Sequence, residues 1–265
     1  MARNPRSPRE QSLAVGVPRG VPIPIATGNV ELVDESDGSV TVYVNGVPSS
    51  SLRADYSLDF EYMRHEAAAI LAWDTAREDH AWLALHVGAA ACSLPRYLAN
   101  AHSASRHIAV DIDVTLAELA RRWWDLPRAP RLRVRAQDGL AALADRADAS
   151  LDLIVRDAFS GDSVPTHLAN ADWWTQAARV LREGGLVVAN VGVAPGSAIA
   201  GADAAACREA FAGVLGVGEH AVLKRKRRGN VVLVATAEPA PALAAALGRY
   251  AASAPLPTGV NANWA

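Results

Sequence analysis

The stretch LALHVGAAACSLPRYL, residues 83–98, decides the fold, because its pattern is that of a buried strand, a tight turn and a helix. Leu83–Val87 is mostly apolar, as the strands of a parallel sheet are. A turn that receives a phosphate usually carries several glycines, so that the backbone can approach the ligand closely. In this turn only Gly88 remains, and Ala89–Ala91 follow it. The stretch therefore indicates a ligand-binding turn that does not receive a pyrophosphate.

Strand and helix patterns alternate from this stretch to residue 191. The predicted strands are Leu83–Val87, Ile108–Ile112, Leu132–Val134, Leu151–Val155 and Leu186–Val191, and the helices between them include Thr115–Trp124 and Asp172–Leu181, the second ended by Gly184-Gly185. Such alternation predicts an α/β fold with a parallel sheet that helices cover on both faces. After it, Glu219–Lys224 and Asn230–Thr236 predict an antiparallel hairpin, and Pro241–Tyr250 predicts a final helix.

Three segments are expected along the chain. Residues 1–27 are rich in Pro, Arg and Gly and are expected to form a disordered leader. Residues 28–75 are expected to form a small antiparallel unit, with turns at Glu35–Gly38 and Asn45-Gly46, followed by a helix that begins near Ser57. Residues 76–265 are expected to form the α/β domain.

The bulk properties exclude several classes of protein. The net charge of −2 over 265 residues offers no basic field for nucleic acid or a membrane surface. Cys92 and Cys207 lie far apart, and the histidines show no metal spacing, so neither a disulfide framework nor a metal site is expected. No apolar run reaches the roughly 18 residues of a membrane span. These properties predict a cytoplasmic protein with small-molecule partners.

Acidic side chains follow three consecutive strands of the predicted sheet. They are Asp111, which lies 23 positions after Gly88, Asp138 and Asp157. Ligands of open α/β sheets bind beyond the carboxyl ends of the strands. There Asp111 can accept hydrogen bonds from ribose hydroxyls, and Asp138 can accept one from the adenine amino group. Each acid taken singly is as well explained as a helix cap, but their register at three strand ends favours a nucleoside site.

Two features argue against a dinucleotide-binding sheet. The motif G-x-G-x-x-G is missing, and an antiparallel hairpin is predicted near the C-terminus. The predicted fold is α/β, with a Rossmann-like sheet of the adenosylmethionine-dependent methyltransferase type and a small N-terminal β-hairpin unit. Its ligand is expected to be an adenosine-type thioether or sulfonium, because neither carries a phosphate.

Five quoted stretches together resemble the spermidine synthase family, the polyamine aminopropyltransferases. They are HVGAAACSLPRYL at 86–98, VDID at 110–113, AQDG at 136–139, LIVRDAFSGDSVPTHLANADWWTQAARVLREGGLVVANV at 153–191, and VNGVPSSSLRADYSLDFEYMRHEAAAIL at 44–71. The resemblance extends over residues 28–236 and is distributed rather than local.

The resemblance implies a homodimer, decarboxylated S-adenosylmethionine as donor, a diamine as acceptor, methylthioadenosine as product and no metal. It places the ribose on Asp111, the adenine amino group on Asp138 and the attacking amine on Asp157. The donor-binding residues implied are Gly88, Ala89, Asp111, Ile112, Asp138 and Gly139. The catalytic residue implied is Asp157, and the substrate-binding residues implied are Tyr62, Asp157 and Asp162.

The chain departs from the family pattern where cationic groups should bind. Ala91 stands where the family has an acid for the aminopropyl ammonium group. Tyr62 is followed by Met63 and Arg64, whereas the family has Tyr-His-Glu, and Ser49 or Ser50 replaces a glutamine. The adenosine half of the site is therefore expected to be retained and the polyamine half to be altered, unless Glu61, Glu66 or Asp162 refills it.

These departures leave three functions open: aminopropyl transfer, methyl transfer from S-adenosylmethionine itself, and nucleoside binding without catalysis. The acceptor is expected to be a small amine, or an acidic molecule that pairs with Arg64 or Arg156.

Three further sequence features carry weaker predictions. The basic run Lys224–Gly229 is interpreted as a solvated hairpin tip. His167 is a candidate to face the substrate, and Trp173-Trp174 are expected to pack in the core.

Overall fold

A small antiparallel sheet of four strands forms the N-terminal part of the computed structural model, which describes residues 14–89, 91–161 and 163–264. Its strands are β1 (Ile23–Ile25), β2 (Gly28–Asp34), β3 (Val40–Val44) and β4 (Val47–Leu52), in that spatial order. Both predicted turns are present. Gly38 N donates to Glu35 O, and Asn45 and Gly46 have φ of 52° and 77°, as a two-residue hairpin turn requires.

The ordered chain begins earlier than the expected boundary of the leader at residue 27. Residues 1–13 lie outside the described part, but β1 pairs antiparallel with β2 through Ile23 and Val30. Ala14 is 3% exposed and donates its backbone N–H to Trp123 O. The prolines and glycines between residues 14 and 27 concealed this packing, because here edge pairing rather than a continuous apolar run provides the order.

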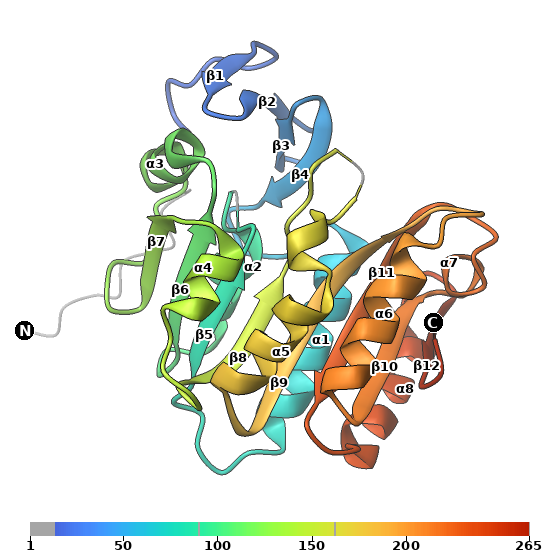
Figure 1. Cartoon of the computed structure of the whole chain (residues 1–265). Coiled ribbons are helices and arrows are strands. Elements are labelled where there is room, and N and C mark those ends of the chain that lie inside the picture. The colour runs from blue at the N-terminus through green and yellow to red at the C-terminus, as the bar shows by residue number, and fades with distance from the viewer. Residues whose placement is uncertain (1–13, 90, 162, 265) are drawn as a thin grey trace, which may run out of the picture.

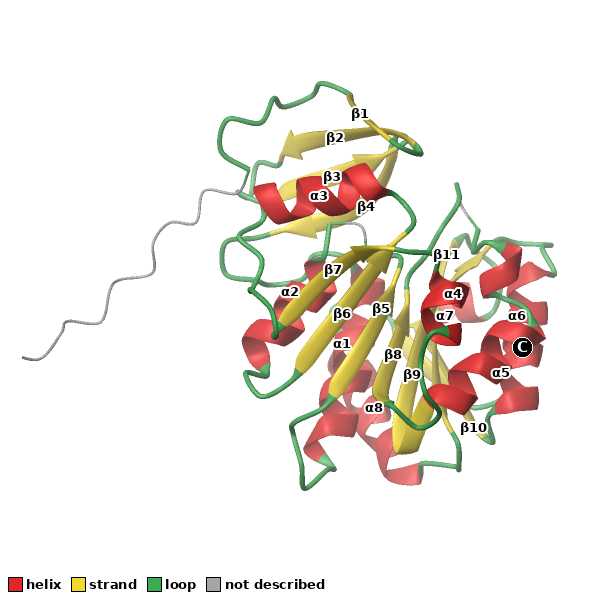
Figure 2. Ribbon diagram, turned by 60° about the vertical axis from the view of Figure 1, so that its left-hand side comes forward, coloured by secondary structure: helices red, strands yellow, loops and turns green. Residues whose placement is uncertain are grey.

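The second sheet has eight strands in the order β12-β10-β11-β9-β8-β5-β6-β7 (Figures 1 and 2). The strands β5 (Leu83–Val87), β6 (Arg106–Asp111), β7 (Leu132–Ala136), β8 (Leu151–Arg156) and β9 (Leu181–Val193) are parallel, which confirms the predicted α/β fold. The strands β10 (Gly213–Glu219), β11 (Gly229–Thr236) and β12 (Thr258–Asn261) are antiparallel to their neighbours. Antiparallel strands at one end of the sheet form the methyltransferase-type arrangement that was predicted.

Helices cover both faces of this sheet, because alternate residues of each strand are buried on opposite sides. The helices are α1 (Glu61–Thr75), α2 (Ser93–Ala101), α3 (Val114–Trp123), α4 (Gly139–Ala144), α5 (Ala171–Val180), α6 (Ile199–Ala210), α7 (His220–Leu223) and α8 (Pro241–Ser253), with a 3₁₀ turn at Thr166–Leu168. Leu85 and Ile154 pack under α5 and α6, whereas Ala84 and Leu153 pack under α1, α2 and α8. Within the described residues, no helix has the length and apolar character of a membrane span.

Two predicted element assignments are wrong near the C-terminal end. The segment Glu219–Lys224 is not a strand, because β10 ends at Glu219 and residues 220–223 form α7, whose Val222 is buried against Gly229. The helix α5 ends at Val180, and Gly184-Gly185 lie inside β9 rather than at the end of the helix. The glycine-rich β10 escaped prediction, since glycine is a poor strand former.

Candidate functional site

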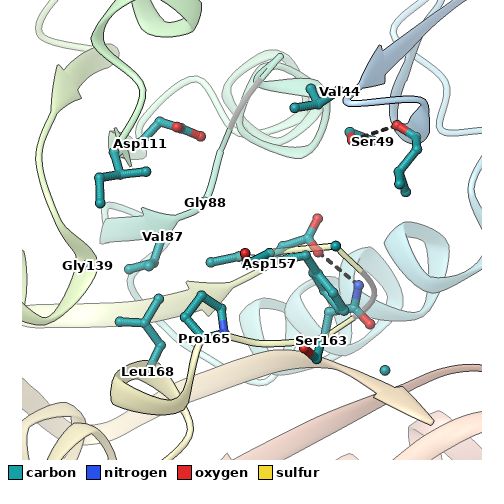
Figure 3. A pocket seen from close by; sticks show the side chains of 18 of the residues that line it. Val44, Ser49, Val87, Gly88, Asp111, Gly139, Asp157, Ser163, Pro165 and Leu168 are labelled. Atoms are coloured by element: carbon teal, nitrogen blue, oxygen red, sulfur yellow. Dashed lines mark hydrogen bonds between the residues drawn. The ribbon is translucent and has the colours of Figure 1, made fainter. Parts of the chain in front are cut away.

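A cavity of about 820 Å³ lies at the carboxyl ends of the parallel strands, with β3 and β4 of the N-terminal sheet above it. Figure 3 shows Asp157 in the middle of this cavity, with Gly88 and Asp111 on one side and Ser163 on the other. Seven predicted site residues line it: Tyr62, Gly88, Asp111, Ile112, Asp138, Gly139 and Asp157. Ala89 packs instead against the apolar cluster beneath the N-terminal sheet. Asp162 lies outside the described residues.

Asp157 follows β8 and is held by two side chains from other elements. Its Oδ2 accepts a hydrogen bond from the Tyr62 hydroxyl at 3.1 Å, and its Oδ1 accepts one from Asn190 Nδ2 at 2.8 Å. Asn190 Oδ1 in turn accepts from Asn230 Nδ2 at 2.9 Å. Burial raises the pKa of Asp157 from 3.8 to about 6, against the opposing effect of the two hydrogen bonds. A carboxyl group with this pKa accepts and releases a proton near neutral pH.

Glu66 gives this region a second buried carboxyl group, one helical turn after Tyr62 on α1. Its side chain is completely buried, and neither oxygen has a hydrogen-bond partner among the described residues. Burial and the nearby charge of Asp157 raise the pKa of Glu66 well above its usual value. Neither Glu66 nor Glu61 lines the large cavity, so neither refills the altered half of the site.

The turn after β5 brings backbone into close contact with the loop after β8. Gly88 has φ of +80°, and a Cβ placed on it would lie 2.4 Å from Ala158 Cα. Cys92, which precedes α2, is buried, and burial raises the pKa of its thiol to about 12. This thiol is a filler of the core rather than a nucleophile. Glycine is thus required at position 88.

At the end of β6, Asp111 and Asp113 both line the cavity, and Asp113 also caps the next helix. Asp111 Oδ1 accepts from the backbone N–H of Asp113 at 2.9 Å. Asp113 Oδ1 accepts from Leu116 N at 2.8 Å, and its Oδ2 accepts from the Thr27 hydroxyl at 2.7 Å. Both acids that this strand delivers therefore reach the cavity wall, and both carboxylate oxygens of Asp113 accept hydrogen bonds from α3 and Thr27.

Asp138 combines the two roles that the sequence left open. Its Oδ1 caps α4 by accepting from Leu140 N and Ala141 N, while its Oδ2 accepts from His167 Nε2 at 2.8 Å. Burial would raise the pKa of Asp138, but the hydrogen bonds from Ala141 and His167 lower it below its usual value. Both Asp138 and His167 line the cavity. His167 therefore faces the same space as the predicted ribose and adenine groups.

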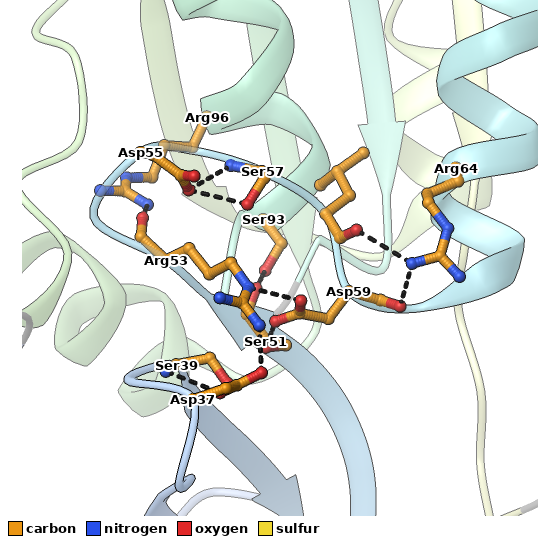
Figure 4. A network of polar contacts seen from close by, with 11 residues as sticks. Asp37, Ser39, Ser51, Arg53, Asp55, Ser57, Asp59, Arg64, Ser93 and Arg96 are labelled. Atoms are coloured by element: carbon orange, nitrogen blue, oxygen red, sulfur yellow. Dashed lines mark hydrogen bonds and ion pairs between the residues drawn. The ribbon is translucent and has the colours of Figure 1, made fainter.

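Arg64 does not line the cavity, contrary to its predicted availability to an acidic ligand. Its guanidinium group donates to the backbone oxygens of Leu58 and Asp59 (Figure 4). The Asp59 side chain accepts from Arg53 and from the Ser51 hydroxyl in the same network. Arg64 thus fixes the segment between β4 and α1. Tyr62, in the first turn of α1, contacts Asp157.

Arg156 is also excluded as a ligand-binding residue. Its side chain is fully buried, where it donates to both carboxylate oxygens of Asp203 and to Leu168 O. The guanidinium carbon lies 4.8 Å from the Trp173 ring and 5.0 Å from the Trp174 ring. Both tryptophans are buried in the core, as expected, and neither lines the cavity.

The arginine that lines the cavity belongs to the basic run before β11. Arg228 lies on the cavity wall, and Arg227 pairs with Glu219. The interpretation of this run as a solvated tip is therefore incomplete. Asn190, Asn230 and Arg228 were not predicted as site residues. Asn190 could have been found from the sequence, because an amide inside the buried strand run LVVANVGV, residues 186–193, needs a polar partner.

The cavity has two sides, separated by Asp157 at the end of β8. The ends of β5, β6 and β7 contribute Gly88, Asp111 and Asp138, and we call this part the β5–β7 side. The ends of β9 and β11 contribute Asn190, Arg228 and Asn230, and we call this part the β9–β11 side. A group bound on either side can approach the carboxyl group between them.

Comparisons with known proteins find relatives of this chain, although no family model matches it. A probable spermidine synthase from Corynebacterium glutamicum is 30% identical, with a TM-score of 0.86 over 93% of this chain and 91% of that one. A curated polyamine aminopropyltransferase of Vibrio vulnificus is 28% identical over 108 residues, which cover 40% of this chain and 36% of that protein. The match thus spans about a third of the curated relative.

A more distant similarity concerns the fold alone. A spermidine synthase solved in complex with the transition state analogue AdoDATO is 14% identical, with a TM-score of 0.63 over 83% of this chain and 75% of that one.

Proposed function

Because the chain belongs to the spermidine synthase family, we propose that it transfers an aminopropyl or related alkyl group from decarboxylated S-adenosylmethionine, or a close relative, to an amine. The products would be methylthioadenosine and the alkylated amine. The observation that carries this proposal is the half-buried Asp157, which Tyr62 and Asn190 hold between the two sides of the cavity. Its pKa of about 6 suits a group that takes a proton from an attacking amine.

The chemistry requires a base but no acid. An alkylamine has a pKa of about 10 and is protonated at neutral pH, so it must lose a proton before its lone pair can attack. The Asp157 carboxylate can bind the ammonium group and accept this proton, and the neutral amine then forms the carbon–nitrogen bond. The carbon–sulfur bond breaks at the same time, and the sulfonium leaves as a neutral thioether. In-line positioning of the two substrates then supplies most of the rate.

The donor is proposed to bind on the β5–β7 side. Asp111 would accept hydrogen bonds from the ribose hydroxyls, with Ile112 beside it. Asp138 would accept one from the adenine amino group, next to Gly139 and His167. All of these residues line the cavity, and close backbone packing at Gly88 shapes its floor. The neighbour that holds AdoDATO supports an adenosine-type co-substrate for this fold.

The acceptor is proposed to bind on the β9–β11 side, with its amine on Asp157. Among the described residues that line this side, the charged group beyond Asp157 is Arg228, and Asn190 and Asn230 supply amides. A buried ammonium group without a counter-ion costs several kcal/mol. We therefore expect an amine whose far end is neutral or anionic in preference to a diamine.

A product assay tests the proposal. The purified protein would be incubated with decarboxylated S-adenosylmethionine and either putrescine or 4-aminobutyrate, and methylthioadenosine would be measured by mass spectrometry. Release with 4-aminobutyrate above putrescine is expected, and it should disappear in the isosteric Asp157→Asn variant. Arg228→Gln should lower the preference for 4-aminobutyrate. Conversion of S-adenosylmethionine to S-adenosylhomocysteine would instead identify a methyltransferase. Binding without conversion of either donor would identify a nucleoside-binding protein.

A further inference from the structure

Asp138 lies on the β5–β7 side of the large cavity, and His167 reaches it from another part of the chain. Asp138 precedes α4, whereas His167 lies in the 3₁₀ turn Thr166–Leu168, after the loop that follows β8. A Cβ placed on Gly139 would lie 3.2 Å from Leu168 Cδ2, so this turn packs directly against the start of α4. Asp138 and His167 both line the cavity, with 34% and 47% of their side chains exposed.

Three hydrogen bonds occupy three of the roughly four acceptor positions of the Asp138 carboxylate. Oδ1 accepts from Leu140 N at 2.9 Å and from Ala141 N at 3.0 Å, and Oδ2 accepts from His167 Nε2 at 2.8 Å. Because both backbone donors are on Oδ1, the remaining position belongs to Oδ2, the oxygen that His167 holds. Among the described residues, no donor fills this position.

Asp138 is ionised at neutral pH, which fixes the direction of these hydrogen bonds. Burial raises its pKa, but the hydrogen bonds from Ala141 and His167 outweigh burial and bring the pKa below its usual value. A carboxylate has no proton to give, so His167 Nε2 carries the shared proton. A ligand can therefore fill the open position on Oδ2 only with a donor such as an N–H group.

Purine bases differ in the group that they would bring to this position. The 6-amino group of adenine donates N–H, whereas a 6-oxo group is an acceptor. A 6-oxo group would set two acceptors against each other with no proton between them, which costs binding free energy. The N–H of His167 matters because it holds Oδ2. Without it, the carboxyl group of Asp138 can turn about its Cβ–Cγ bond, and two positions on Oδ2 are left to water.

We propose that His167 is a positioning residue that makes the cavity select a 6-aminopurine nucleoside over its 6-oxo counterpart. It acts through Asp138, by holding Oδ2 where the amino group of the base donates to it. This inference rests on the proposed function and deepens it, because the nucleoside would be that of the donor. His167 lies in the turn that ends the loop beginning at Asp157, so the base-selecting contact and the proposed catalytic carboxyl group lie at the two ends of one loop.

Two nucleosides that differ at purine position 6 test the proposal by calorimetry with the intact protein. Methylthioadenosine has the 6-amino group, should bind more tightly, and is compared with 5′-methylthioinosine, which has the 6-oxo group. His167→Phe keeps a ring but removes the N–H, and it should reduce the ratio of the two affinities about tenfold, as expected for a hydrogen bond to a charged group. His167→Gln, whose amide can donate to Asp138, should keep most of the ratio. His220→Phe, which changes an exposed histidine outside the cavity wall, should not alter it.

The ratio of affinities separates this inference from a structural role and from the proposed function. Loss of folding would weaken the binding of both nucleosides equally, and circular dichroism would reveal it. Selection of methylthioadenosine by a protein that transfers no alkyl group would contradict the proposed function and support the inference. An unchanged ratio in folded His167→Phe, or equal or reversed affinities in the parent protein, would overturn the inference and leave the proposed function standing. Binding of neither nucleoside would overturn both.

Discussion

Replacing Asp157 with asparagine should make the protein more stable at neutral and alkaline pH, although it removes the proposed base. The pKa of the folded carboxyl group is about 6, against 3.8 for an exposed one. The folded state therefore holds the carboxyl proton of Asp157 more tightly than the unfolded state. The stability that this proton provides is present below pH 4 and is lost as the pH rises through 6. The gap of about two pH units corresponds to about 3 kcal/mol, lost in full by pH 8.

Asp157→Asn keeps the volume of the side chain and removes this loss. Its amide oxygen can still accept from Asn190, and its amide nitrogen can donate to the Tyr62 oxygen. Urea unfolding should therefore show the variant about 3 kcal/mol more stable than the parent at pH 8, with the difference falling toward zero at pH 4. A variant that is less stable at pH 8, or a difference that does not change with pH, would refute this reasoning about burial.

The ionisation of Asp157 should also appear in the pH dependence of turnover. In the parent protein, kcat/KM should rise with pH through about 6 as the carboxylate forms. Asp157→Asn should abolish turnover and leave methylthioadenosine binding within about twofold, which calorimetry would measure. Unchanged turnover in this variant would exclude Asp157 as the base.

Other perturbations have equally defined outcomes. Gly88→Ala should weaken methylthioadenosine binding by at least tenfold in calorimetry, because its Cβ would meet Ala158 at 2.4 Å and its φ is +80°; unchanged affinity would mean that the turn does not shape the site. Asp203→Ala should lower the free energy of unfolding by about 3–5 kcal/mol in urea, because it leaves Arg156 buried and unpaired; a loss below about 1 kcal/mol would contradict this. Glu66→Leu should raise the free energy of unfolding by about 1–3 kcal/mol in the same assay, because it removes a buried carboxyl group that lacks a partner; a destabilised variant would show that Glu66 is bound after all.

The strand ends could be predicted from the sequence because they follow from local patterns. A buried run that ends in an acid places that acid at the carboxyl edge of a parallel sheet, wherever the strand lies in the order. Asp111, Asp138 and Asp157 accordingly line one cavity. Tyr62 could be placed there through the family resemblance, and its hydroxyl does reach Asp157.

The β9–β11 side could not be predicted in the same way. Asn190 and Asn230 meet because β9 pairs with β11, and this pairing depends on the order of the strands rather than on either strand's sequence. Arg228 enters the cavity for the same reason, although its basic run suggests only a solvated loop. The sequence suggested Arg64 and Arg156 as ligand-binding arginines instead. Arg64 donates to the nearby backbone oxygen of Asp59, and Arg156 pairs with Asp203, which lies 47 positions further along the chain.

The contact between His86 and His107 could not be predicted either. They are 21 positions apart in the sequence and meet because β5 and β6 are adjacent in the sheet. The predicted homodimer and the domain boundary at residues 75–76 stay predictions.

Calorimetric titration with four nucleosides tests the central claim most directly. They are methylthioadenosine, decarboxylated S-adenosylmethionine, S-adenosylmethionine and S-adenosylhomocysteine, each added to the intact protein at pH 7.5. An aminopropyltransferase with Asp157 between donor and acceptor predicts that the first two bind more tightly than the last two. Tighter binding of S-adenosylmethionine and S-adenosylhomocysteine, or no binding of any of the four, would contradict that claim.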